Sequence, residues 1–132
     1  ATNKLTIQVK DTTVVNHTIS TTLSTGTWYQ IAITRDGDTM NTYIGASLDA
    51  GSPWTGRSGD LGSGDDWALG TFNTASGNWD GTQDILTIYN RVLTSTEIST
   101  HNNSGTGLQW PFSTTAPPVV DVDNAIFFAI NM

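Results

Sequence analysis

The stretch Trp28-Tyr29-Gln30-Ile31-Ala32-Ile33-Thr34-Arg35 decides the fold of this chain. Every second side chain from Tyr29 to Ile33 is a large apolar group facing one way, which is the period-two pattern of a β-strand. The turn Asp36-Gly37-Asp38 follows directly, and the pair Asp-Gly supplies the positive φ that a tight hairpin needs. A second strand-like run extends from Met40 to Ile44. The sequence therefore predicts a β-hairpin at this point.

Two further strands are predicted before this hairpin. From Lys4 to Lys10 polar and apolar residues alternate strictly, as they do in a half-buried strand. A shorter run, Val14 to Ile19, is predicted as a second strand. After the hairpin, the segment from Gly45 to Asp66 is rich in Gly, Ser, Asp and Pro. This composition is typical of a long surface excursion, with room for one short strand.

The second half of the chain is predicted to add two strands and one helical turn. Trp67 to Phe72 and Gln83 to Asn90 carry strand patterns, and the latter is apolar on both faces. We therefore expect Gln83 to Asn90 to be covered on both sides. The run Thr94-Ser95-Thr96-Glu97 has the spacing of a capping box, in which the first and last side chains each bond the other residue's backbone N–H. It predicts a helical turn anchored by Leu93 and Ile98.

Length, charge and cysteine content exclude several classes of protein. The 132 residues have room for one hydrophobic core. Five Lys and Arg against twelve Asp and Glu give a net charge of −7, without a basic stripe, which argues against nucleic acid and anionic membranes as partners. The absence of Cys removes disulfides, thiolate metal sites and a cysteine nucleophile. No apolar run reaches the roughly 18 residues that a membrane helix needs.

The sequence is divided into a domain over residues 1–112 and a linker with an apolar tail over residues 113–132. Ser113 to Pro118 is linker-like in composition. Ala125 to Ile130 is the most apolar stretch of the chain, is uncharged and has high β-propensity, so it would favour aggregation if left exposed. It therefore needs a partner surface, in this molecule or in another one. The tail residues expected to dock are Ile126, Phe127, Phe128 and Ile130.

Two motifs resemble a known family. The quoted strand lies within Gly26 to Gly37, which has the form G-x-W-[HY]-x-[IV]-A-x-[ST]-x-[DN]-G. Trp79 to Ile98 matches a second, longer motif that closes on R-[AV]-L-[ST]-x-x-E-I. Both resemble the laminin G-like, concanavalin A-like jelly-roll family, and the resemblance covers residues 4 to 104. It implies an all-β fold, an antiparallel β-sandwich of the concanavalin A-like jelly-roll type.

The chain departs from the family pattern at two places. Family members usually carry several strands before the one that resembles Lys4 to Lys10, so we expect a sandwich truncated on its N-terminal side, with part of a sheet face or edge missing. The family also does not predict the extended tail over residues 113–132. Both departures suggest that a neighbouring subunit or a larger parent protein completes the structure. Strand donation is one physical route.

No catalytic set is found in the sequence. Glycan-cleaving enzymes need two carboxylates about 5 to 10 Å apart. Glu97 is the only Glu, and its predicted capping role accounts for it. Asp80 and Asp84 would lie roughly 13 Å apart along a strand, which is too far for the usual pair unless a bulge intervenes. His17 and His101 fall in unrelated segments without a nucleophile motif. We therefore predict a protein that is not an enzyme.

Two kinds of ligand site are weighed. The resemblance implies that calcium can bind at a sandwich rim, and the candidate oxygen ligands are Asp60, Asp65, Asp66 and Asp80, although Asp also favours turns. No cofactor is required, and calcium is an option. Trp54 and Trp79 lie near Gly-rich loops and are the candidates for stacking on a sugar. Their alternative role is to cover the rim of the core or a subunit interface.

The preferred hypothesis is a non-enzymatic structural or adhesion subunit on a virion surface, such as a capsid decoration or fibre protein, which docks on partner chains. The alternative is a calcium-assisted carbohydrate-binding module of a secreted or cell-surface protein. Both place the chain on a virion surface or outside a cell. The expected partners are other protein subunits, in a homo-oligomer or a larger assembly, or glycans. A glycan array with and without chelator separates the two hypotheses.

Overall fold

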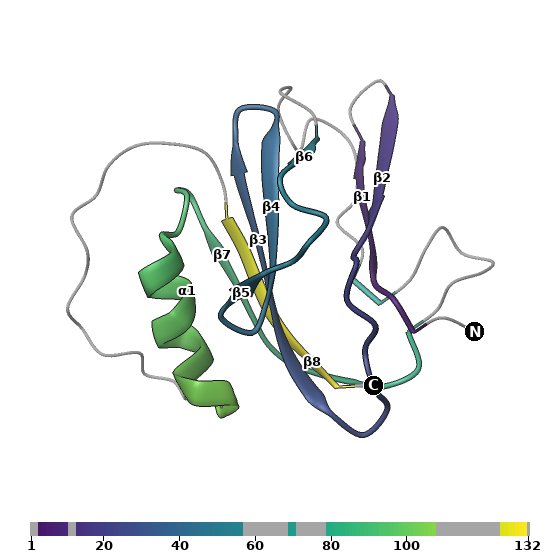
Figure 1. Cartoon of the computed structure of the whole chain (residues 1–132), viewed down its shortest axis with the longest axis vertical. Helices are drawn as coiled ribbons and strands as arrows, with labels where there is room; N and C mark the ends of the chain where they lie inside the picture. The colour runs from purple at the N-terminus through teal and green to yellow at the C-terminus, as the bar shows by residue number, and fades with distance from the viewer. Residues whose placement is uncertain (1–2, 11–12, 57–68, 71–78, 108–124, 132) are drawn as a thin grey trace.

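The computed structural model describes residues 3–10, 13–56, 69–70, 79–107 and 125–131, the last of these by their backbone. These residues form two antiparallel β-sheets and one short helix (Figure 1). The predicted antiparallel β-sandwich is confirmed. The strand predicted over Trp67 to Phe72 lies almost entirely outside the described residues. So does the surface excursion beyond Gly56.

The smaller sheet pairs strand β1 (Thr6–Lys10) with β2 (Val14–Thr18). The predicted alternation along β1 is confirmed, because Ile7 and Val9 are buried while the residues between them are exposed. On the exposed side the polar side chains pair across the strands, as in the 3.0 Å hydrogen bond from Gln8 Nε2 to Asn16 Oδ1. The hairpin therefore presents an apolar face to the second sheet and a polar face to solvent.

The larger sheet is built from six strands, and its main path has the order β5-β4-β3-β8-β7, with β6 paired to β4. The predicted hairpin is confirmed as the antiparallel pair of β3 and β4, and Gly37 in its turn has a φ of 59°. The strand bounds are β3 (Trp28–Asp36), β4 (Thr39–Ile44), β5 (Ser47–Leu48), β6 (Trp54–Thr55), β7 (Thr82–Tyr89) and β8 (Ala125–Asn131).

Strand β8 holds the apolar segment for which the sequence demanded a partner surface. It lies between β3 and β7 and pairs antiparallel with both of them. Ala32 and Thr87 oppose the same β8 residue, Phe127, from the two sides. The sequence left open whether the partner surface lies in this molecule or in another one. In the structure the segment is a strand of the chain's own larger sheet. Docking of the segment on another chain stays a prediction.

Helix α1 (Ser95–Asn102) lies on one side of the larger sheet, and β1 and β2 lie on the other (Figure 1). The predicted capping box is confirmed: Thr94 Oγ1 accepts from Glu97 N–H at 3.2 Å, and Glu97 Oε2 accepts from Thr94 N–H at 2.8 Å. The helix runs for eight residues, longer than the single predicted turn. In the second turn, His101 Nε2 lies 3.0 Å from Tyr89 Oη of β7, and this contact with the sheet stabilises the additional turn. A short 3-10 helix, η1 (Asn103–Gly105), follows it.

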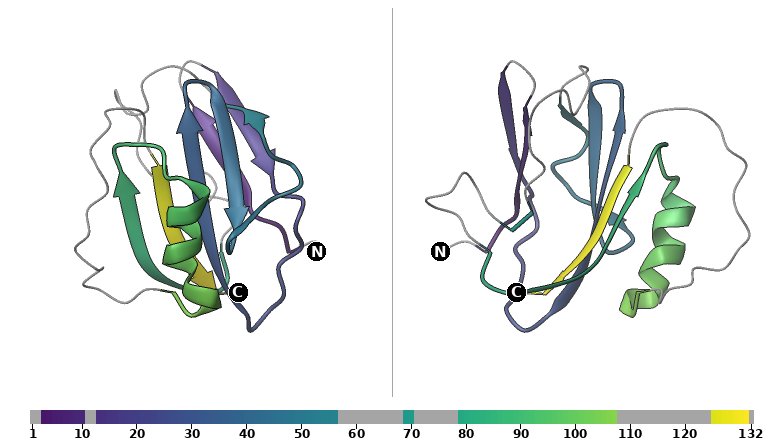
Figure 2. Two further views of the ribbon diagram at one scale, coloured as in Figure 1. Left: turned by 60° about the vertical axis from the view of Figure 1, so that its left-hand side comes forward. Right: turned by 180° about the vertical axis from the view of Figure 1, so that it is seen from behind.

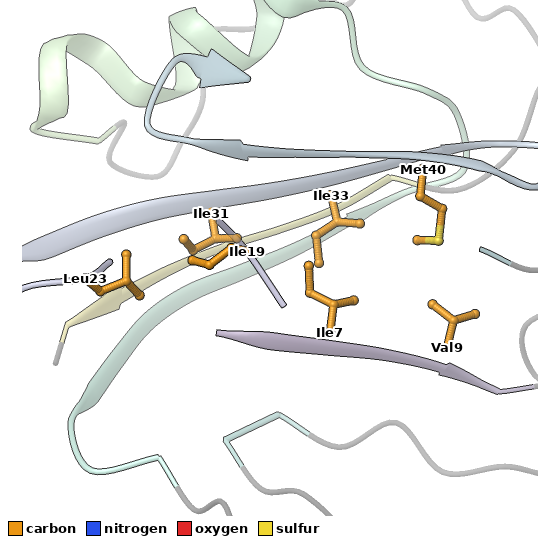
Figure 3. Close-up of a cluster of buried hydrophobic side chains, with 7 residues drawn as sticks. All are labelled: Ile7, Val9, Ile19, Leu23, Ile31, Ile33 and Met40. Atoms are coloured by element: carbon orange, nitrogen blue, oxygen red, sulfur yellow. The ribbon is translucent and has the colours of Figure 1, made fainter. Parts of the chain in front are cut away.

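The main core lies between the two sheets (Figure 3). Ile7 and Val9 point from β1 toward Ile33 and Met40 of the larger sheet. The buried members of this core are Ile7, Val9, Ile19, Leu23, Ile31, Ile33 and Met40. A second, smaller core lies under α1 and consists of Ala32, Leu93 and Ile98, with Tyr43 and Tyr89 packed against it. The middle of β3 is thus covered on both faces.

Strand β7 does not have the two-sided cover that its sequence predicted, and the prediction was wrong for one face. Leu86 is 52% exposed and Ile88 is 54% exposed. Through β8, the register places these two side chains on the same face as Ile31 and Ile33 of β3. The β1–β2 sheet packs against that face over β3 and β4, whereas β7 is two strands further along (Figure 2). β7 does carry apolar side chains on both faces, but on this face the described residues leave Leu86 and Ile88 exposed to solvent.

Candidate functional site

Trp54, the first candidate for sugar stacking, is used in packing between the layers. Its indole ring stacks on the imidazole of His17 in β2, with ring centroids 4.5 Å apart and an interplanar angle of 4°. Its Nε1–H donates to Thr42 Oγ1 at 3.1 Å. One ring face and the only polar group of the indole are therefore engaged within the protein. This geometry favours the rim-covering alternative for Trp54.

Trp79, the second candidate, precedes β7 and is partly buried against the main core. Its backbone N–H donates to the carbonyl of Gly70 at 2.7 Å. Trp54 and Trp79 both pack against the main core, so the structure brings the two candidates to the same hydrophobic cluster. Sugar stacking on Trp79 stays a prediction.

Only one of the four predicted calcium ligands is among the residues that the structure describes. Asp60, Asp65 and Asp66 lie outside the described residues, whereas Asp80 is described and is exposed. Within the described part of the chain, no group of three or more His, Asp or Glu side chains could hold a metal ion. Calcium binding therefore stays a prediction.

The sequence did not single out Asp49, which is a buried carboxylate at the junction of the two sheets. Its Oδ1 accepts from the N–H and Oγ1–H of Thr21, at 2.9 and 2.7 Å. Its Oδ2 accepts from Ser20 N–H at 2.8 Å and Gly51 N–H at 3.1 Å. Burial alone would raise the pKa of this carboxyl, but the hydrogen bonds outweigh it and lower the pKa from 3.8 to about 2. No local pattern could reveal this role, because two of its partners lie 28 and 29 residues away.

A histidine and a serine lie close to Asp49, but they do not form a catalytic relay. A Cβ added at Gly51 would meet Ser20 Oγ at 3.0 Å, His17 Cε1 at 3.1 Å and Asp49 Oδ2 at 3.2 Å. Each carboxylate oxygen already accepts two hydrogen bonds from Ser20, Thr21 or Gly51, so neither is available to orient the imidazole. Burial lowers the pKa of His17, against the attraction of Asp49, and its Nε2 is buried without a hydrogen-bond partner. The group is a structural clamp.

Helix α1 is fixed to the end of β7 by a second charged group. Arg91 donates to both carboxylate oxygens of Glu97, at 2.9 and 2.6 Å. This hydrogen bonding, helped by Thr94, lowers the pKa of Glu97 to about 2. Tyr89 Oη and His101 Nε2 lie 3.0 Å apart beneath the helix. The sequence identified the cap of this helix but missed the Arg91 ion pair, although the spacing of six residues across the turn was visible.

Two surface features remain as candidate binding regions. The first is an open depression of about 720 Å³ between the β4–β5 turn and α1, lined by hydroxyl and amide side chains with Ala46. Among the described residues, its lining carries neither aromatic nor ionised side chains, which are the usual anchors of a specific ligand. The second is the exposed apolar pair Leu86 and Ile88, which we call the β7 face. An exposed apolar sheet face of this kind suits another protein surface.

The layers and the strand order define an antiparallel β-sandwich, a scaffold that suits a binding or adhesion module. Residues 1–99 match the family model described as the concanavalin A-like lectin/glucanases superfamily, a laminin G-like model, and the chain belongs to this family. The comparisons with curated proteins and with solved structures gave no match. Domains of this kind are generally non-enzymatic and typically extracellular. No helix in the described part of the chain is long and apolar enough to cross a membrane.

Proposed function

We propose that the chain is a non-enzymatic structural or adhesion subunit that docks on a partner protein through the β7 face, within a virion surface or an extracellular assembly. The observation that carries this proposal is the half-exposed state of Leu86 and Ile88. Both lie on the sheet face that forms the main core over β3 and β4. Burying such side chains is worth roughly 1.5 to 3 kcal/mol each when they are fully desolvated.

The chemistry of the β7 face favours a protein partner. It is aliphatic and belongs to a sheet, and sheets cover one another at a spacing of about 10 Å through such faces. Gln83 of β7, which its pairing partner Ile130 places on the same face as Leu86, is exposed and belongs to the polar rim expected around an interface. The virion location is supported by composition alone: few charges, many hydroxyl side chains and no Cys.

The docking proposal is tested by a double variant, Leu86→Ser with Ile88→Thr. Val14→Ser is the matched control, because Val14 is 44% exposed on β2, in the other sheet. The variants are added to the purified particle or cell-surface fraction of the source, and the bound share is measured by co-sedimentation. We expect at least a tenfold loss for the double variant and none for the control, with unchanged circular dichroism. Equal binding of the parent chain, the double variant and the control would rule out docking through the β7 face.

The location of the chain needs a separate experiment. An antibody against the chain is tested on intact virions and on cell surfaces, and the surface that it labels is the location.

The calcium-assisted carbohydrate-binding module is the second proposal. It is supported by the family's description, which includes lectins, and by the partial exposure of Trp79 next to the exposed Asp80. A glycan array with calcium and then with chelator tests it. Binding of a defined sugar that disappears in Trp79→Ala and Asp80→Asn, but not in Trp54→Phe, would place this proposal ahead of protein docking.

A further inference from the structure

We propose that the slot between β3 and β7 can take its strand from a second copy of the chain, so that two copies exchange β8. The slot is defined by the facing edges of β3 and β7, and in one copy the chain's own β8 occupies it. The inference concerns backbone pairing inside the sheet and is independent of docking through the β7 face.

The slot needs a strand because both of its walls are otherwise unpaired there. β8 makes seven residue pairs with β3 and seven with β7. Removing β8 would expose two rows of backbone N–H and C=O groups, each of which must find a partner. The strand itself, Ala125 to Asn131, has no charge and is strongly apolar, so it also needs the slot. The slot therefore needs a strand and β8 needs a slot, whichever copy of the chain supplies each of them.

Other contacts hold the walls of the slot in place. Helix α1 packs on both of them, because Ile98 and Leu93 form one cluster with Ala32 of β3 and Tyr89 of β7. Gln30 Nε2 of β3 also donates to the carbonyl of Ile98 at 3.3 Å. Figure 2 shows the helix lying across β8 and its neighbours. Since α1 contacts both β3 and β7, we expect it to keep these two strands at the spacing of the slot when β8 leaves.

The connection to β8 is long enough to reach a second copy. Seventeen residues, 108–124, separate Gly107 from Ala125, and three of them are Pro. Extended at about 3.1 Å per residue they span roughly 50 Å. A folded chain of this size has a radius of gyration of about 14 Å, so that reach exceeds its diameter.

A second copy offers the one slot whose sequence complements β8 residue for residue, so exchange keeps every pair intact. The choice between the chain's own slot and a neighbour's is then set by concentration. A connection that can span the distance to the slot holds its strand there at an effective concentration of up to the order of mM. We therefore expect closed single chains in dilute solution and exchange where chains are crowded, as they are in an assembly.

The test is disulfide cross-linking between introduced cysteines, and the chain has no Cys of its own that could interfere. Asp84 and Ala129 oppose each other across β7 and β8, and directly opposed residues have Cα atoms about 4.5–5.5 Å apart, which a disulfide spans. Full-length Asp84→Cys and full-length Ala129→Cys are unfolded, mixed, refolded together at mM concentration and oxidised. The double variant Asp84→Cys with Ala129→Cys, refolded in dilute solution, reports whether β8 occupies its own slot. A mixture of Gln8→Cys with Ala129→Cys is the matched control, because Gln8 is exposed on the other sheet.

We expect a disulfide-linked heterodimer in the Asp84–Ala129 mixture, at least tenfold more abundant than in the control mixture. Its share should fall at least tenfold when the refolding concentration is lowered to the μM range. The double variant should cross-link within one chain. A heterodimer no more abundant than in the control, together with efficient cross-linking of the double variant, would overturn exchange. Failure of the double variant to cross-link would overturn it as well, because β8 would then not occupy the slot.

Discussion

Strands β3 and β7 belong to one sheet and carry similar aliphatic patterns, yet their environments differ. On the face turned toward the β1–β2 sheet, Ile31 of β3 is fully buried, whereas Leu86 of β7 is 52% exposed. The two side chains share that face through the same β8 residue, Phe128. The difference therefore comes from what lies opposite each strand. An apolar pattern predicts which side chains seek cover, but it does not predict which layer supplies the cover.

The largest expected effect compares a truncation in each strand. Ile31→Ala should lower the free energy of unfolding by about 3 to 4 kcal/mol, because it leaves a cavity between the two sheets. Leu86→Ala should cost less than about 1 kcal/mol, because its side chain is half in water already. Urea unfolding followed by tryptophan fluorescence measures both. Similar losses in the two variants would show that β7 is covered as well as β3.

The next effect concerns the clamp that holds the smaller sheet over β3 and β4. Asp49→Asn should cost about 2 kcal/mol at neutral pH, which is the free energy equivalent to the lowering of the pKa of Asp49 from 3.8 to about 2. The folded pKa lies below the unfolded one, so the stabilisation is complete above about pH 4 and disappears as the pH falls toward 2. Urea midpoints measured between pH 5 and pH 2 report it.

The exposed Asp38→Asn is the control for this clamp. If Asp49→Asn kept the steep acid dependence of the parent chain, the clamp would not be its source.

The smallest effect concerns α1, which covers the other face of β7. Glu97→Gln removes one charge from the pair with Arg91, weakens the capping box, and should cost about 1 to 1.5 kcal/mol. Hydrogen bonding by Arg91 and Thr94 lowers the pKa of Glu97 from 4.5 to about 2, so this stabilisation is present above about pH 4.5 and is lost toward pH 2. Thr94→Ala should cost about 1 kcal/mol without removing the ion pair.

Helical circular dichroism during urea unfolding measures both variants. A loss from Glu97→Gln no larger than that from Thr94→Ala would mean that the Arg91 pair contributes nothing to the stability of α1.

The candidate site was less predictable than the fold. The sequence named Trp54 and Trp79 as candidates for sugar stacking, and only the structure shows that His17 covers one face of Trp54. Asp49 accepts four hydrogen bonds at the junction of the sheets, and it gave no local signal because three of them come from Ser20 and Thr21, in another segment. Three of the four proposed metal ligands lie outside the described residues.

The sequence by itself determined the features that depend on neighbours in the chain. These are the period-two strands, the Asp36-Gly37 turn, the Thr94–Glu97 capping box and, through its motifs, the β-sandwich class. Only the tertiary structure decided that β8 lies between β3 and β7 and that the β7 face is open. The physical reason is that side-chain alternation and capping are set within a few residues. Which strands become neighbours, and which faces are covered, depends on contacts between segments far apart in the chain.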